Sequence, residues 1–143
     1  MLNIKIMVRY EDCILFLLSK AYQKASANFK KQLHEQGLTP VQNLVIQALY
    51  EEEGSSAGEL GKKLLFDNAT LSGVLDRLAD SGWIVKEFAD EDKRFLKLRL
   101  TPKAKERIAI LFEATEKANE EILKPLRSEE RLLLTRILKD LQK

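Results

Sequence analysis

Apolar residues recur along this chain at two different spacings. One set repeats every three or four positions, as on the buried face of a helix: Leu71, Val74, Leu75 and Leu78. A second set alternates with polar residues, as in a half-buried strand: Leu96, Leu98 and Leu100. Between residues 54 and 101 these patterns predict two short helices followed by a β-hairpin.

The starts of the two short helices are given by residues that cap helices. Ser56 and Glu59 have the spacing of a capping box, so one helix should begin there. Residues 67–70 supply cap formers for the next helix. If its leucines are buried, this second helix presents a polar outer face: Asn68, Thr70, Ser72, Gly73, Asp76 and Arg77.

The hairpin follows a predicted helix stop. Gly82 stands where a left-handed residue would end the second helix. Residues 83–88 are rich in aromatic and β-branched side chains, which favours a strand, and residues 90–93 form a polar turn. Two helices and a hairpin in this order predict a winged helix-turn-helix.

The flanking segments carry more apolar surface than one small domain requires. Residues 10–36 predict a helix with two apolar stripes, ended by Gly37. A capping box at residues 39–42 starts the next helix, and Thr101 with a following proline starts a long one. Pro125 should end or kink that helix.

The last helix should begin at Ser128. It is unusually rich in leucine and isoleucine: Leu132, Leu133, Leu134, Ile137, Leu138 and Leu141. One winged domain is too small to bury all of these side chains. We therefore expect the terminal helices of two chains to interlock as a homodimer. The alternative is a compact monomer with buried tails.

Length and composition fit one domain. The chain has 143 residues, 45% hydrophobic and 32% charged. We expect one domain over residues 1–143, mainly α with a small antiparallel β-wing. Residues 10–36 and 102–143 form dimerisation helices, and residues 38–101 form the winged helix-turn-helix. No apolar run is long enough to span a membrane, and the first nine residues make a poor signal peptide, so we expect a cytoplasmic protein.

Positive charge is concentrated after the predicted turn. The net charge of the chain is only +2, but residues 93–107 include seven basic residues and one acidic residue, which gives this segment a charge of +6. The basic residues of this run are Lys93, Arg94, Lys97, Arg99, Lys103, Lys105 and Arg107. A run of this sign on a wing could follow a phosphate backbone. The alternative is an ordinary solvated basic face.

Several motifs resemble the multiple antibiotic resistance regulator (MarR) family. Residues 92–94, read Asp-Lys-Arg, and residues 98–101, read Leu-Arg-Leu-Thr, look like its wing signature. Residues 38–42 and 71–82 resemble the helix start before its reading head and its recognition helix. The resemblance implies a dimeric repressor or activator that reads a pseudo-palindromic operator in double-stranded DNA. It also implies release by a small molecule or by oxidation.

The resemblance also implies the positions that touch DNA. On the predicted helices and wing these are Ser56, Asn68, Ala69, Thr70, Ser72, Gly73, Arg77, Lys93 and Arg94. Arg94 would lie in or beside the minor groove, with its guanidinium held by Asp92. Many relatives carry a basic residue where this chain has Gly73, so specificity would depend more on Asn68, Thr70, Ser72 or DNA shape. The alternative for residues 92–94 is a turn with incidental charges.

Catalytic and metal-binding constellations are scarce in the sequence. His34 and Cys13 are the only histidine and cysteine, so neither a triad nor a thiolate or imidazole metal cluster fits one chain. Residues 51–53, three glutamates, are better explained as a solvated helix end. We expect no enzyme, cofactor or metal. A winged helix for protein contacts is the second function class, and an enzyme the third.

Two regulatory hypotheses remain. Family effectors are often aromatic acids or phenols, and Tyr22, Phe29 and Phe112 are candidate pocket walls, although ordinary core is the simpler explanation of all three. One branch of the family senses peroxide through a cysteine on the first helix. Cys13 lies two residues out of that register, and a buried thiol in apolar surroundings is usually inert, so it is either a redox site or a structural cysteine.

Overall fold

The computed structural model describes residues 8–64, 66–89 and 92–143, with the backbone alone for residues 89 and 92–95. Its elements follow the chain in this order: η1 (Tyr10–Asp12), α1 (Ile14–Leu33), η2 (His34–Gln36), α2 (Pro40–Glu51), α3 (Ala57–Leu64), α4 (Asn68–Asp80), β1 (Ile84–Ala89), β2 (Asp92–Leu100), α5 (Pro102–Leu123) and α6 (Ser128–Asp140). The predicted fold class, mainly α with a small antiparallel wing, is confirmed. No described helix has the length and apolar character needed to cross a membrane.

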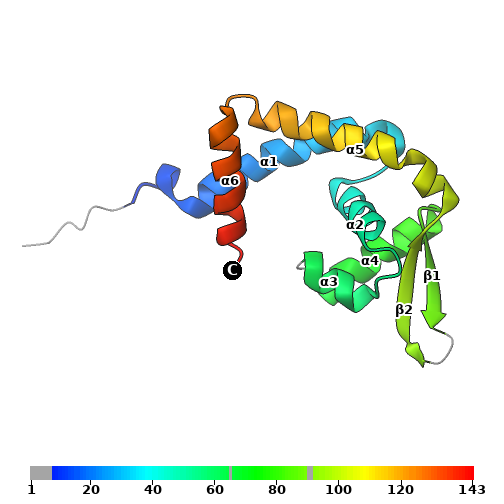
Figure 1. Ribbon diagram of the computed structural model, residues 1–143. Coiled ribbons are helices and arrows are strands. Elements are labelled where there is room, and N and C mark those ends of the chain that lie inside the picture. Colours follow the sequence, from blue (N-terminus) through cyan, green and yellow to red (C-terminus); the bar gives the residue numbers. More distant parts are fainter. Residues whose placement is uncertain (1–7, 65, 90–91) are drawn as a thin grey trace, which may run out of the picture.

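The molecule has two structural regions (Figure 1). We call α1, α5 and α6 the helical frame, and α2, α3, α4, β1 and β2 the winged region. Within the frame, α1 and α5 lie side by side. The winged region lies at one end of this pair, with the hairpin extending away from it.

Hydrogen-bonded caps define the helix starts, as the sequence predicted. The Thr39 hydroxyl accepts from the backbone N of Gln42 at 3.2 Å, and the Gln42 side chain accepts from the backbone N of Thr39 at 2.9 Å. Thr101 caps α5 in the same way, accepting from the backbone N of Ala104 at 3.2 Å. Each cap satisfies a backbone donor that has no partner within its helix.

The first helix is shorter than predicted, because the chain is extended at Cys13, with φ −67° and ψ 126°. The short helix η1 precedes this residue, and η2 replaces the last predicted turn. The rings of Tyr10 and Phe16 meet edge to face, with centroids 5.4 Å apart. Six positions span about 1.7 turns, so in a continuous helix these two side chains would point about 120° apart; here the rings meet across the break.

One apolar core joins the winged region to the frame. It includes the four leucine and valine side chains predicted for the buried face of α4, and Leu33 and Leu111 contribute from α1 and α5. Leu98 and Leu100 point into the core from β2, whereas Lys97 and Arg99 are exposed, as the alternating pattern predicted. The core therefore holds α4 and the hairpin in a fixed relation.

The hairpin differs from its prediction at the turn. Strand β2 begins at Asp92, which pairs with Ala89, so residues 92 and 93 belong to the strand and not to the turn. The loop before α3 also pairs with this strand. The backbone N of Gly54 donates to Leu98 O, and Leu98 N donates to Ser55 O, both at 3.0 Å. The alternation of polar and apolar side chains along β2 could not predict this pairing, because the pairing is made by backbone atoms of only a few residues.

The final helices form as predicted around Pro125. Helix α5 ends at Leu123, and Ser128 is the first residue of α6. Glu130 accepts from the backbone N of Arg127 at 3.0 Å, which closes the start of α6. Arg131 then donates to both carboxylate oxygens of Glu120, at 2.7 and 3.0 Å, and ties α6 to α5. This bidentate pair lowers the pKa of Glu120.

Candidate DNA interface

Helix α4 is positioned by its cap and by its buried face. The Asp67 carboxylate accepts from the backbone N of Thr70 at 2.7 Å and from the Thr70 hydroxyl at 2.9 Å. At the other end, Gly82 adopts φ +80°, and the backbone N of Trp83 donates to Leu78 O at 2.9 Å. This left-handed stop turns the chain directly into β1, as the sequence predicted.

The outer face of α4 brings together most of the residues predicted to contact DNA. Five of them have exposed side chains on this one helix: Asn68, Ala69, Thr70, Ser72 and Arg77. Gly73 lies among them, and a Cβ built there would meet nothing within 4 Å. The missing side chain at Gly73 therefore leaves open space on this face, which a larger residue would fill.

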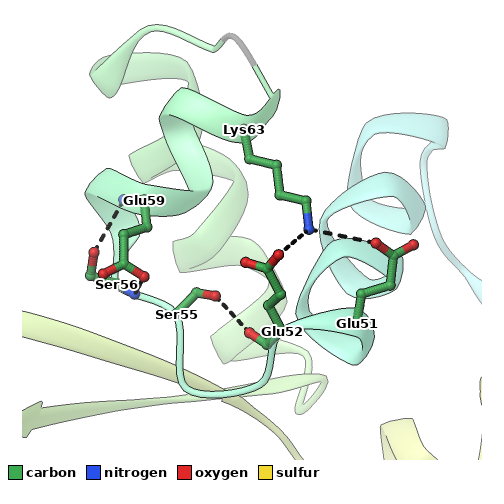
Figure 2. A network of polar contacts seen from close by, with 6 residues as sticks. All are labelled: Glu51, Glu52, Ser55, Ser56, Glu59 and Lys63. Carbon is green, nitrogen blue, oxygen red and sulfur yellow. Dashed lines mark hydrogen bonds and ion pairs between the residues drawn. The ribbon is translucent and has the colours of Figure 1, made fainter.

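Ser56 stands at the start of α3 and not on α4 (Figure 2). Its hydroxyl accepts from the backbone N of Glu59 at 3.1 Å, and its backbone N donates to the Glu59 carboxylate at 3.4 Å. Ser56 also forms a bridge with Lys97 of β2. The same serine thus caps α3 and fixes that helix against the wing.

The wing residues are located only in part. Asp92, Lys93 and Arg94 lie on β2, but their side chains are outside the described part of the chain. The predicted contact between Asp92 and Arg94 therefore stays a prediction. Strand pairing places these residues at the tip of the hairpin, opposite the end of β1. A tip in this position extends beyond the helices of the winged region.

The basic run carries less free charge than its sequence suggests. Arg99 pairs with Glu87 across the hairpin at 2.9 Å, and Lys105 pairs with Glu53 at 3.0 Å. Both acidic partners lie outside residues 93–107, so the local count of +6 omits them. Ion pairs on an exposed surface leave part of the field in place, but the net positive charge around this segment is smaller than the sequence count.

The three glutamates of residues 51–53 lie exposed at the end of α2, as predicted, and they also form ion pairs. Figure 2 shows the Lys63 ammonium between Glu52, at 3.0 Å, and Glu51, at 3.5 Å. The Glu52 carboxylate, with a smaller contribution from Glu51, raises the pKa of Lys63. The Ser55 hydroxyl donates to Glu52 O at 2.6 Å. These contacts hold α3 against the end of α2. Within the described segments, no cluster of three His, Cys, Asp or Glu side chains could hold a metal ion.

Trp83 and the start of α5 form a contact that the sequence analysis missed. The Trp83 side chain is buried, and the Lys103 ammonium lies 4.8 Å from its ring centroid. Lys103 also donates to Ser81 O at 2.9 Å, close to the end of α4. A cation at the carboxyl end of a helix is favoured by the helix dipole. This lysine thus stabilises the end of α4, a role that the basic run alone did not suggest.

The predicted pocket residues do not all meet. Tyr22 and Phe29 line one apolar groove of 170 Å³ between α1 and α2, together with Ala25, Ser26, Pro40, Val41 and Leu44. Phe112 does not line this groove. Its ring meets Tyr50 edge to face, with centroids 5.5 Å apart. The structure therefore joins two of the three candidates and places the third in another contact.

A polar junction, also missed from sequence, links the two regions. The side chains of Asn43 and Gln47 on α2 both donate to the hydroxyl of Thr115 on α5, at 3.0 and 2.6 Å. Thr115 donates in turn to Leu111 O at 2.9 Å. Asn43 is fully buried, so this junction lies inside the contact between α2 and α5.

Cys13 is exposed, so the expectation of a buried thiol is wrong for the single chain. It precedes α1 as the N-cap residue and makes no capping hydrogen bond through its side chain. Ile14, Leu15 and Leu17, which follow it in α1, are exposed as well, so Cys13 shares the exposure of this end of the helix.

Known proteins show the same architecture. The MarR family model matches residues 36–94. The HTH-type transcriptional regulator MhqR of Bacillus subtilis is 24% identical over 126 residues, which are 88% of this chain and 87% of that protein. The structure of a probable transcriptional regulator from Pseudomonas aeruginosa is 31% identical, with a TM-score of 0.88 over 93% of this chain and 99% of that one. The structure of reduced AbfR bound to DNA is 26% identical, with a TM-score of 0.75 over 92% and 91%.

A capped helix with an exposed polar face, followed by a basic hairpin, defines a winged helix-turn-helix regulator of transcription that binds DNA. The chain belongs to the MarR family, as the wing and recognition-helix motifs predicted. The matching proteins are named as transcriptional regulators.

Proposed function

We propose that the protein is a homodimeric, operator-binding repressor that acts in the cytoplasm and releases DNA when a small, mostly apolar ligand binds. In this proposal α4 enters the major groove with its first turn leading, and Arg94 lies in or beside the minor groove. The two copies read half-sites of a pseudo-palindromic operator about one helical turn apart. DNA binding by reduced AbfR supports the first part of this proposal.

The dimer is supported by the apolar surface of the frame. Large apolar side chains of α1 and α6 are exposed in the single chain, among them Ile14, Leu15, Leu132, Leu133 and Leu141. A water-exposed face of this size is typical of an interface. A second copy with the same faces would cover it through a twofold contact.

The groove beside Tyr22 and Phe29 is the single observation that carries the ligand hypothesis. One wall belongs to α1 of the frame, and the other to the first turns of α2 in the winged region. A ligand that widens this groove would move the two regions relative to each other. In a dimer, the same movement changes the distance between the two α4 helices, so the half-sites could no longer be read together. The groove's apolar lining and two aromatic rings suit an aromatic carboxylate or a phenol.

A release experiment tests this function. We would first find a DNA fragment from the neighbourhood of the protein's own gene that the protein retards in a gel. Aromatic carboxylates and phenols are then titrated against that complex. At least one should release the DNA, and Ala25→Leu, which fills the groove, should weaken the release about tenfold or more. Ala27→Leu, on an exposed position of α1 outside the groove, is the matched control and should respond as the wild type.

Two results would count against the proposal. If no fragment is retarded, the protein does not read an operator under these conditions, and the second class, a winged helix for protein contacts, takes its place. If DNA is retarded but no such ligand releases it, the ligand hypothesis fails while operator binding stands.

A further inference from the structure

The hydrogen bonds at the start of α4 fix the direction of one proton. The Asp67 Oδ1 atom accepts from the backbone N of Thr70, and its Oδ2 atom lies 2.9 Å from the Thr70 hydroxyl oxygen. The hydrogen bond from the backbone of Thr70, and then the one from its hydroxyl, lower the pKa of Asp67. The carboxylate is therefore ionised at neutral pH, and an ionised carboxylate accepts hydrogen bonds without donating any. Thr70 must be the donor in this pair.

Donation to Asp67 decides what the Thr70 side chain offers to DNA. A threonine hydroxyl has one proton, and here that proton points back to Asp67. Only the oxygen lone pairs remain for a partner in front of the exposed helix turn. In the major groove, the amino groups of adenine and cytosine are donors, whereas the keto oxygens of guanine and thymine are acceptors. A threonine normally contacts either kind, but this one can bond only an amino group.

We infer that Thr70, held by Asp67, makes the recognition helix select an adenine or a cytosine and reject a keto base at the position it faces. This inference rests on the proposed function, since it requires α4 to enter the major groove. Thr70 is the contacting residue, and Asp67 is a positioning residue that sets the polarity of the contact. The negative charge of Asp67 adds to the selection, because it repels a keto oxygen and attracts an amino group.

The substitution Asp67→Asn should reverse this polarity without removing the cap. Asparagine is as good an N-cap residue as aspartate, so its Oδ1 atom can still accept from the backbone N of Thr70. Its amide nitrogen then takes the place of Oδ2 and donates to the Thr70 hydroxyl oxygen. The hydroxyl proton is released to point outward, where it bonds a keto oxygen. Thr70→Val removes the hydroxyl and keeps the branched shape.

A matched control separates polarity from charge. Asp67→Asn removes one negative charge, which strengthens binding to any DNA. Asp80→Asn makes the same change at an exposed position in the last turn of α4, away from the capping residue. It should change affinity for all duplexes alike and leave base preference as in the wild type.

The experiment uses the full chain and two kinds of duplex. The wild-type protein first selects its preferred sequence from a library of random duplexes. In the selected duplex, each adenine is then replaced by inosine and each cytosine by uracil, with the partner base adjusted, which exchanges an amino group for a keto oxygen. At one position of each half-site, wild-type affinity should fall about tenfold. The Asp67→Asn variant should prefer the keto duplex there, and Thr70→Val should bind both within about twofold of each other.

The possible results distinguish a failure of this inference from a failure of the proposed operator binding. If Asp67→Asn or Thr70→Val keeps the wild-type amino preference at every position, the inference is overturned while operator reading stands. If the wild-type protein enriches no sequence at all, operator reading itself fails, and the inference fails with it.

Discussion

The winged region and the helical frame use the same residue types in opposite ways. In the winged region, Leu60, Leu78 and Leu98 are at most 1% exposed. In the frame, Leu15 is 72% exposed and Leu132 is 76% exposed. The two regions differ little in hydrophobic content, so composition does not explain the contrast. Most leucines of the winged region are buried within one chain, whereas α1 and α6 of the frame expose theirs, as expected of faces that a partner covers.

This contrast shows where sequence changes should act. A change in the core of the winged region should alter folding of the single chain. A change on the exposed face of the frame should alter association. A change on the outer surface of α4 or the wing should alter DNA binding and leave both other properties intact.

The largest effect is expected on the frame. Leu133→Glu combined with Ile137→Glu places two charges one turn apart on the exposed apolar face of α6, which a second copy would have to bury without partners. We expect a monomer at micromolar concentration that keeps the far-UV circular dichroism spectrum of the wild type. Sedimentation equilibrium measures the mass. Thr135→Glu, on another side of α6, is the control, and a dimeric double variant would refute the assignment of this face.

The next effect is expected in the core of the winged region. Leu98→Ala should lower the free energy of unfolding by about 2–5 kcal/mol, because it leaves a cavity beneath the wing. Val85→Ala, at a half-exposed position of β1, should cost much less. Urea denaturation of both variants measures the difference. Equal losses would mean that the hairpin does not pack on this core.

A smaller effect is expected at the tip of the wing. Arg94→Ala should weaken DNA binding by about 1–3 kcal/mol and reduce the salt dependence by about one counterion, with folding and dimerisation unchanged. Affinity measured over a salt series tests both numbers. Arg136→Ala on α6 removes the same charge from the frame and should leave both unchanged. Wild-type binding by Arg94→Ala at physiological salt would contradict the placement of the wing on DNA.

The smallest effect is expected at Cys13. Since its side chain caps nothing, Cys13→Ser should change the free energy of unfolding by less than about 0.5 kcal/mol. We expect peroxide to leave the protein–DNA complex intact in both forms. Peroxide release in the wild type that is abolished in Cys13→Ser would instead identify an oxidation sensor.

The sequence predicted local features well because their causes are local. The capping boxes at Thr39 and Ser56, the left-handed Gly82 and the helix stop at Pro125 each depend on a few neighbouring residues. The buried face of α4 followed from one periodic pattern in the same way.

Features that join distant segments were not accessible from pattern alone. The charge on the wing and at the start of α5 depends on Glu87 and Glu53, which lie outside the basic run. Phe112 was grouped with Tyr22 and Phe29 because all three are aromatic, but periodicity does not say which faces of different helices meet.

The junction at Thr115 gives the contact between the two regions a discrete character. Apolar side chains interlock where two helices touch, but they have no directional bonding requirement of the kind that hydrogen bonds impose. The Thr115 hydroxyl uses its proton on Leu111 O and accepts from two amides of α2, so its bonding capacity is filled. A shift of α2 by a fraction of a turn would break both of these hydrogen bonds and leave the side-chain amides of Asn43 and Gln47 without their partner. The junction therefore favours one position of α2 on α5, and a move to another position has to break both hydrogen bonds together.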